Sequence, residues 1–386
     1  MAGGGRRRLS ARDLNRATLA RQLLLAREPL PAAVGVRRVL ALQAQEPVGP
    51  YLALTARLEG FAPEDLDAAY AAGAVARSTL LRMTIHAVSA EDYPTLYGTM
   101  HKRLRGARLG DPRFTKTGVP AAAALEALPE LLEHLTVPRS KDEIDDWLGE
   151  RLGVRHERVF WALRSFAPFW HVPNGGPWSF ARGHAFRAAP EPMREPWEEA
   201  AAAALRRYLR AFGPATVKDF ARFTLLTREM AREAVAAAGD TIVGYEGPDG
   251  SELFDVPGAP LPDGDTPAPP RLLPMWDSAL MAHEVPGRLL DDGLRPLVVK
   301  RNGDVLPTVL LDGRVAGVWR PAERGVEVSA FRKLTRDEWD GLAAEAERLA
   351  PLAERGPLLH ARFLNWWRDL EAAEVRLLPY ATTSVR

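Results

Sequence analysis

The sequence predicts an α+β protein built from several small domains, on the basis of three observations. The chain has 386 residues, enough for two or three domains at roughly 150 residues each. In its first two thirds, two short helices followed by a β-hairpin recur, whereas the last third has the two-residue periodicity of strands. A proline-rich segment, residues 257–270, separates these parts and predicts a stiff, extended linker.

The clearest helix–helix–hairpin segment spans residues 140–181. Ser140 opens a capping-box pattern, which satisfies free amide groups at the start of a helix. Gly153 ends this helix, and a second helix follows. The aromatic strands Phe169–Val172 and Trp178–Phe180 then flank an Asn-Gly-Gly turn. Two helices followed by a hairpin are typical of a winged helix.

A segment of the same kind covers residues 205–256. Thr216 and Thr227 are placed to cap its two helices. Thr241–Tyr245 and Glu252–Val256 flank a Gly-Pro-Asp-Gly turn, which predicts the second hairpin.

A looser version opens the chain. Ser10 is placed to cap a first helix, and a second helix leads through Val36 to Leu42. Thr79–Arg82 and Thr84–Val88 are the strands expected in its hairpin. The first two thirds therefore predict three tandem winged helices.

Beyond the linker, the sequence predicts a small domain that is β-barrel-like or built on a sheet. Asn302-Gly303 and Asp312-Gly313 are strong hairpin turns, and helices are expected near residues 335–349 and 358–370. The expected strands are Leu297–Arg301, Val305–Leu311, Val315–Trp319 and Val326–Phe331. The expected domains are residues 1–118, 119–194 and 195–256 for the winged helices, 257–270 for the linker and 271–386 for the C-terminal domain.

Composition excludes several classes of protein. The chain has no cysteine, so disulfides, thiolate zinc sites and cysteine nucleophiles are excluded. No apolar run approaches the ~20 residues that span a bilayer, and the first residues lack the apolar core of a signal peptide. We expect a cytoplasmic protein that binds no membrane. No metal or phosphate-loop motif occurs, so no cofactor is expected.

The net charge of +1 conceals an uneven distribution. Residues 1–45 hold nine arginines against two acids, residues 151–189 hold six against one, and residues 246–293 hold two against ten. Such segregation predicts a basic face that binds a polyanion and an acidic back. The alternative is that each block is an ordinary solvated helix face.

The most informative short motif is Gln43-Ala-Gln45, followed by Glu46 and Pro47. Pro47 disfavours helix at Glu46, so both glutamines are expected where a helix unwinds. In extended or turn geometry, residues two apart point the same way, and both carboxamides can converge on one water or one sugar. The alternative is that they bond the free carbonyls of a helix end.

Four stretches together resemble the winged-helix DNA glycosylases of the AlkZ/YcaQ type. They are the Gln-x-Gln motif, Arg77–His86, Leu273–Asp277 followed by His283, and Pro307–Arg320, in this order over nearly the whole chain. The resemblance implies a C-shaped protein of three winged helices and a C-terminal β-barrel, with Gln43 and Gln45 as catalytic residues. The YcaQ branch has Asp at the second position, so Gln45 is similar to the AlkZ branch.

The resemblance also implies a substrate. Members of the family excise bulky N-alkylpurines, including interstrand crosslinks, and the AlkZ branch gives self-resistance to producers of DNA-alkylating antibiotics. We therefore expect a DNA glycosylase that hydrolyses the N-glycosidic bond of an N7-alkylguanine adduct in double-stranded DNA. It is expected to act as a monomer that associates with the nucleoid when bound to DNA.

This reaction suits neutral amides. A glutamine amide is not a useful base at neutral pH, but an N7-alkylguanine is positively charged and leaves without a general acid. The enzyme then needs only to orient a water and stabilise an oxocarbenium-like sugar. No lysine lies near the motif in the sequence to form a Schiff base, so a monofunctional enzyme without strand cleavage is expected.

Contacts to DNA are expected mainly from the first winged helix. Tyr97–Lys116 is predicted to be a loop that contacts the DNA backbone, and His86 is expected at DNA, with a structural role as the alternative. Asp277 and His283 are interpreted as structural. The expected DNA-binding residues are Arg37, Arg38, Arg77, Arg82, His86, Lys102, Arg103 and Arg105.

Two other functions fit the same pattern. A non-catalytic DNA-binding regulator would use the helices at 155–166 and 228–238 in the major groove, prefer one operator sequence and release no base. A sequestering protein would bind the alkylating toxin itself, and protection would persist without Gln43 and Gln45.

Overall fold

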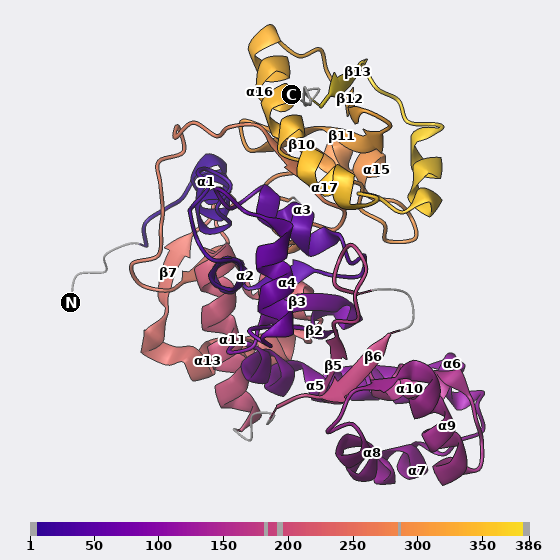
Figure 1. The fold of residues 1–386 in the computed structure, drawn as a ribbon. Coiled ribbons are helices and arrows are strands. Elements are labelled where there is room, and N and C mark those ends of the chain that lie inside the picture. Colours follow the sequence, from indigo (N-terminus) through magenta and orange to yellow (C-terminus); the bar gives the residue numbers. More distant parts are fainter. Residues whose placement is uncertain (1–5, 181–183, 191–195, 285–286, 381–386) are drawn as a thin grey trace, which may run out of the picture.

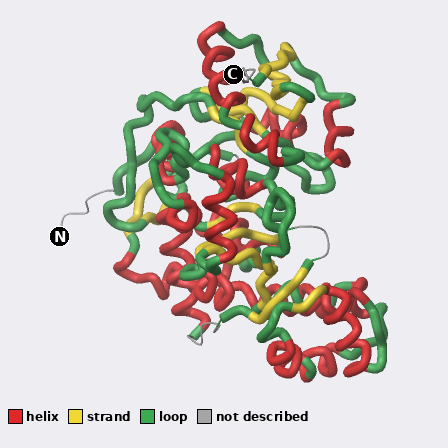
Figure 2. Tube along the Cα trace, viewed as in Figure 1, coloured by secondary structure: helices red, strands yellow, loops and turns green. Residues whose placement is uncertain are grey.

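The computed structural model describes residues 6–180, 184–190, 196–284 and 287–380. It is a mixed α+β structure in which short strands form small sheets among many helices (Figure 2). Figure 1 shows the C-terminal part, in orange and yellow, at one end of the molecule and residues 119–180 at the other. No described helix is both long and apolar enough to cross a membrane.

The first part of the chain surrounds a three-stranded antiparallel sheet. Its elements are α1 (Ala11–Arg21), α2 (Ala32–Val39), β1 (Ala41–Gln43), α3 (Gly49–Thr55), α4 (Pro63–Ala71), β2 (Val75–Thr79), η1 (Leu81–Met83), β3 (Ile85–Ser89), α5 (Tyr93–Leu109) and α6 (Pro112–Thr115). Ser10 caps α1 through a capping box with Asp13, as expected. The hairpin is β2–β3, so the strand expected at Thr84–Val88 is confirmed, whereas the one expected at Thr79–Arg82 lies earlier, at Val75–Thr79, and η1 follows it. β1 pairs with this hairpin in the order β1-β3-β2. The sequence did not indicate this third strand, which carries the first motif glutamine.

The expected loop at Tyr97–Lys116 is mostly helix. In α5, Leu96, Met100 and Leu104 recur every four residues and are buried, which is the spacing of one helix face. Lys102, Arg103 and Arg105 lie on the exposed side of α5, whereas the Arg108 side chain is 13% exposed and packs on the ring of Trp161. The prediction of a loop was wrong, because α5 continues through Gly98 and Gly106 to Leu109.

The second part has a sheet of order β4-β6-β5. Its elements are α7 (Ala121–Glu126), α8 (Leu128–His134), β4 (Arg139–Ser140), α9 (Lys141–Leu152), α10 (Glu157–Leu163), β5 (Phe169–Val172) and β6 (Ala185–Ala188). The capping box at Ser140 and the end of α9 at Gly153 are confirmed.

The expected strand at Trp178–Phe180 was wrong, because β5 pairs with β6. Trp178 and Phe180 instead pack onto the first part of the chain. Their ring centroids lie 5.2 Å from that of Tyr51 and 4.9 Å from that of Tyr70, respectively. Burial of these rings in a neighbouring unit, rather than strand pairing, explains the aromatic run.

The third part matches the prediction closely. Its elements are α11 (Trp197–Phe212), α12 (Val217–Thr224), α13 (Arg228–Ala238), η2 (Gly239–Thr241), β7 (Val243–Glu246) and β8 (Glu252–Asp255). Thr216 and Thr227 cap α12 and α13, and β7–β8 is the expected hairpin.

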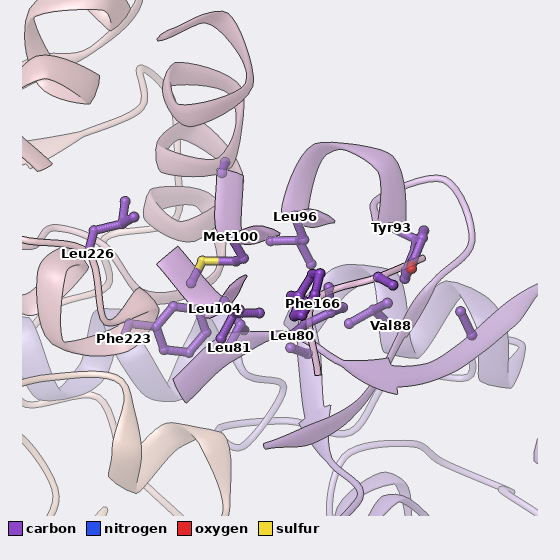
Figure 3. Close-up of a cluster of buried hydrophobic side chains, with 14 of the residues drawn as sticks. Leu80, Leu81, Val88, Tyr93, Leu96, Met100, Leu104, Phe166, Phe223 and Leu226 are labelled. Carbon is purple, nitrogen blue, oxygen red and sulfur yellow. The ribbon is translucent and has the colours of Figure 1, made fainter. Parts of the chain in front are cut away.

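One hydrophobic core joins these three parts. Figure 3 shows Leu81 and Leu104 of the first part, Phe166 of the second and Phe223 of the third within one cluster. Because each part buries side chains of the others, the three parts pack as one body rather than as separate domains.

The C-terminal part is a five-stranded antiparallel sheet of order β13-β12-β11-β10-β9. Its elements are β9 (Arg271–Leu273), α14 (Ser278–Met281), η3 (Asp292–Leu294), α15 (Arg295–Val298), β10 (Thr308–Leu311), β11 (Arg314–Ala322), β12 (Gly325–Ala330), α16 (Arg336–Glu347), α17 (Ala350–Arg355), η4 (Ala361–Trp367) and β13 (Glu374–Pro379).

This sheet corrects several expectations. Among the described strands it is open, since β9 and β13 are edges with no mutual pairing, so the barrel-like expectation reduces to a sheet. The strand expected at Leu297–Arg301 is replaced by α15 and a turn, and the helix expected at 358–370 is the 3₁₀ segment η4. The β10–β11 hairpin around Asp312-Gly313 is confirmed.

Five arginines of the basic N-terminal segment form ion pairs with acidic residues of the same chain. The ion pairs are Arg6–Glu252, Arg8–Glu246, Arg12–Asp265, Arg16–Asp312 and Arg21–Asp255. Arg12, Arg16 and Arg21 also donate to the linker carbonyls of Gly264, Thr266 and Pro260. The interpretation of this block as a DNA-binding face is therefore corrected, because these arginines fasten α1 to the linker and its neighbours.

Two of the ion pairs that connect distant segments are fully buried. Arg21 bonds both carboxylate oxygens of Asp255 at 2.7 Å. Arg57, after α3, bonds Asp277 at 2.7 and 2.9 Å, and both side chains are 0% exposed. Asp277 also accepts from the amide of Ala279 at the start of α14. The structural interpretation of Asp277 thus agrees with its contacts.

We expect Asp277→Asn to lower the free energy of unfolding by about 3–5 kcal/mol, because it leaves the buried guanidinium of Arg57 without its counter-charge. The substitution keeps the shape of the side chain and its oxygen for Ala279. Urea or thermal denaturation measures the change.

The matched control is Asp265→Asn, whose side chain is 95% exposed and lies 3.7 Å from Arg12. Its expected cost is below about 1 kcal/mol. Equal effects of the two substitutions would show that the buried pair does not hold the C-terminal part in place.

Candidate active site

The glutamine motif lies where α2 changes into β1. Leu40, between the two elements, has a left-handed backbone with φ of 73°. The antiparallel pairing of β1 with β3 places Gln43 opposite His86. A Cβ atom on Gly49 would lie 2.8 Å from the Gln43 carbonyl oxygen, so glycine is needed for the tight return of the chain into α3.

The two glutamines have different surroundings. The Gln43 side chain is 9% exposed, whereas Gln45 is on the surface. The Gln43 Oε1 accepts a hydrogen bond of 2.7 Å from the Gln45 backbone N–H, which closes a small loop around Ala44. The fold therefore brings the two residues together through one side chain and one backbone group.

The Ala44 carbonyl is held by Arg77 of β2. Nε and Nη2 of Arg77 donate to this oxygen at 3.2 and 3.0 Å, and Nη1 donates to Nδ1 of His171 at 3.1 Å. The guanidinium lies 4.5 Å from the ring centroid of Phe180. Burial lowers the pKa of Arg77 to about 10, so the group stays charged at neutral pH.

Arg77 was expected to bind DNA, and its position corrects that expectation. It is 2% exposed, and the Ala44 carbonyl, His171 and the face of Phe180 occupy its surroundings. Arg77 is a positioning residue for the loop between the two glutamines, because a charge-assisted hydrogen bond to a backbone carbonyl restricts that carbonyl strongly.

His86 and Arg82 were also expected to contact DNA, but their side chains bond groups of the protein itself. His86 is fully buried, and burial together with the nearby positive charge of Arg82 lowers its pKa to about 3, so it is neutral. Its Nδ1 lies 3.1 Å from the Thr84 carbonyl oxygen and its Nε2 lies 3.2 Å from Nη2 of Arg82. Arg82 also donates to the carbonyl of Phe223 and stacks on that ring. Both residues fix the β2–β3 hairpin against α12.

A small cavity opens beside Gln43, with a volume of about 20 Å³, which is the space that one water molecule needs. Its polar side chains are Gln43 and Glu46 of the motif and His360 of the C-terminal part. Most of its remaining wall is apolar and comes from Val48, Leu52, Met275, Trp276, Leu358 and Leu359. The cavity thus lies where the motif meets the C-terminal part of the chain.

Two features of this wall could not be inferred from the sequence. Arg362 of η4 forms an ion pair with Glu46, a contact between residues with no local pattern in common. Trp276 has φ of 53°, an uncommon conformation for a residue with a side chain. Its indole N–H donates to the Gly303 carbonyl at 3.0 Å, and Phe363 packs edge-on against its ring.

The remaining expected DNA-binding residues are exposed and differ in their partners. Arg37 and Arg38 form ion pairs with Glu91 and Glu28, at 2.8 and 3.3 Å, respectively. The exposed cations of α5 have no carboxylate partner in the described part of the chain; these are Lys102, Arg103 and Arg105. Over the described ranges, no three His, Asp or Glu side chains are placed to share a metal ion.

Comparison with known proteins shows the family of the chain and a shared fold. The family model described as DNA glycosylase AlkZ-like matches residues 36–352. The solved structure of the Streptomyces sahachiroi DNA glycosylase AlkZ superimposes with a TM-score of 0.75 at 23% sequence identity, over 91% of this chain and 99% of that one. At this identity the likeness shows a shared fold. No curated protein matches the sequence. The family model covers most of the chain, including the glutamine motif, and the chain therefore belongs to the AlkZ-like DNA glycosylase family.

Proposed function

We propose that the protein is a monofunctional glycosylase that hydrolyses the N-glycosidic bond of bulky N7-alkylguanine adducts in duplex DNA, including interstrand crosslinks. Its role would be self-resistance to a DNA-alkylating natural product, and it would act in the cytoplasm as a monomer, on the nucleoid. The observation that carries the proposal is the Gln43-Ala44-Gln45 loop, fixed by Arg77 beside a cavity with room for one water.

The substrate chemistry explains why such a site suffices. N7-alkylation places a positive charge on guanine, so breaking the C1′–N9 bond releases a neutral base. The protein must orient a water and favour the positive charge that develops on the sugar, and carbonyl oxygens of fixed glutamines are suited to both tasks. Gln45 is exposed and thus accessible to DNA, while Gln43 lines the cavity.

The fold supports a duplex substrate. We propose that residues 1–118, 119–194 and 195–256 are three winged helices, arranged as a C along the DNA and completed by residues 271–386. Helices followed by paired strands support this, most clearly α12 and α13 followed by β7–β8. Their shared core would let them bind as one rigid body.

The DNA-binding surface that we propose is centred on α5. Lys102, Arg103 and Arg105 are exposed and free of carboxylate partners within the described residues, so their charge is available to phosphates. Arg37 and Arg38, being paired with acids, would contribute less.

The first test removes the motif side chains. Gln43→Ala and Gln45→Ala should each lower the single-turnover rate of abasic-site formation in an oligonucleotide with one N7-alkylguanine by about 10²-fold, because the water or the sugar loses its orientation. Affinity for the same duplex, measured by fluorescence anisotropy, should change less than about twofold.

The control is Asn302→Ala, which removes an exposed amide that bonds Asp304 in the same surface turn. It should leave both the rate of abasic-site formation and the affinity for the duplex unchanged. An unchanged rate in both glutamine variants, or a parallel loss of affinity, argues against the site. A wild-type chain that binds one operator sequence tightly and releases no base would instead be the regulator.

The second test concerns Arg77. Arg77→Met should lower the free energy of unfolding by about 2–4 kcal/mol, because the Ala44 carbonyl and His171 lose their donor inside the protein. It should also slow base release at least tenfold while leaving DNA affinity and its salt dependence unchanged. Denaturation, single-turnover rates and a salt titration of binding measure the three effects.

The matched control is Arg336→Met on α16, whose side chain is 91% exposed; none of the three quantities should change. A phosphate-binding Arg77 would show the opposite pattern, with weaker binding and a shallower salt dependence.

The third test compares the two sets of cations. Lys102→Ala with Arg105→Ala should weaken duplex binding and reduce the slope of log K against log salt by up to about 0.9 for each phosphate that is no longer neutralised. Arg37→Ala with Arg38→Ala should have a smaller effect on both. A larger effect of the second pair would place the DNA on α2 rather than on α5.

A further inference from the structure

The motif loop carries a carboxylate that the resemblance did not assign. Glu46 follows Gln45 directly and lines the same cavity as Gln43, and its side chain is only 18% exposed. It is the one acidic side chain among the residues that line this cavity. Neither glutamine can accept a proton at neutral pH, so Glu46 and His360 are the groups in the cavity wall that can. His360 is exposed and its Nδ1 already accepts a hydrogen bond of 3.1 Å from the Arg362 backbone amide, so Glu46 is the more buried group suited to that step.

The surroundings fix this carboxylate. Nη2 of Arg362 donates to Oε1 of Glu46, and the described residues make no hydrogen bond to Oε2. The backbone is fixed as well, since the Glu46 carbonyl accepts from the amide of Gly49 at 3.0 Å. Arg362 itself packs on the ring of Phe363, with 4.4 Å to the centroid. One oxygen is therefore oriented by a partner, and the other has no hydrogen-bond donor among the described residues, so it can accept a hydrogen bond from a water in the cavity.

We propose that Glu46 is the general base of the reaction, held in place by Arg362; this rests on the proposed glycosylase function. The water in the cavity donates one hydrogen bond to Oε2 of Glu46 and the other to Oε1 of Gln43. The Gln43 oxygen has a second lone pair beside the one that accepts from Gln45. A lone pair of the water then points toward the sugar.

The step is balanced in atoms and charge. The water oxygen forms a bond to C1′ of the deoxyribose while the C1′–N9 bond breaks. The electron pair of that bond passes to the purine and cancels its positive charge. The proton of the water passes to the Glu46 carboxylate, which becomes neutral. The products are a neutral alkylated guanine and an abasic sugar with a hydroxyl at C1′.

The experiment measures base release by Glu46→Ala and Glu46→Gln under single-turnover conditions, on a duplex with one N7-methylguanine. General-base catalysis is typically worth 10²–10⁴-fold, so both variants should be slower by about 10²-fold or more, with affinity for the duplex unchanged. The matched control is Glu59→Ala, which removes an exposed glutamate that also pairs with an arginine, Arg348, and should leave the rate unchanged.

Azide separates a base from a structural role. As an anion it attacks C1′ without losing a proton, so it should restore at least a tenth of the missing rate to Glu46→Ala and yield a deoxyribosyl azide, detected by mass spectrometry. It should not accelerate Gln45→Ala. Thermal denaturation of Glu46→Ala verifies that the variant is folded.

Three results overturn the assignment. If the wild type is active and both Glu46 variants release base at a rate within threefold of it, the reaction does not need the carboxylate. A slow, folded Glu46→Ala that azide does not accelerate assigns Glu46 to structure alone. A wild type that releases no base overturns the proposed function itself, and the role of Glu46 with it.

Discussion

The site depends on the hydrogen bonds from Arg77 to the carbonyl between the two glutamines. A charged guanidinium in the interior needs several partners, and Arg77 takes them from three places: Ala44 in the motif loop, His171 in β5 and the face of Phe180. The last two belong to the second part of the chain. The contacts that hold the motif loop therefore form only when the first two parts pack together, so the geometry of the candidate site depends on the tertiary assembly.

Charge is compensated across the molecule in a similar way. Basic and acidic blocks that are separate in the sequence meet in the fold, where Arg21 and Asp255 form a buried pair and Arg16 pairs with Asp312. The positive charge of α1 is therefore largely cancelled by the acidic residues packed around it. We therefore expect Lys102, Arg103 and Arg105 of α5, which have no carboxylate partner among the described residues, to influence DNA binding more than the larger basic block at the N-terminus.

Local features could be predicted from the sequence, and long-range ones could not. The capping boxes at Ser10, Ser140 and Thr216 are formed within four residues, so their patterns were sufficient. The burial of Arg77, by contrast, depends on His171, which lies 94 residues further along the chain. The burial of His86 depends on Arg82, which bonds both His86 and the distant Phe223. Glu46 belongs to the same class, because the cavity that gives it a role is completed by residues from the C-terminal part. The polar residues of β2 in the sequence also did not show whether Arg77 points to solvent or, as observed, supports the loop at Ala44.

The central claim is that the site around Gln43 and Gln45 hydrolyses an already charged nucleoside, and mass spectrometry of both products tests it most directly. A duplex with one N7-alkylguanine is incubated with excess protein, and the released base and the modified strand are weighed. The account predicts free alkylated guanine together with an uncleaved strand that carries a hydrated abasic site. A bound duplex of unchanged mass, or a cleaved strand covalently trapped by borohydride, would contradict it.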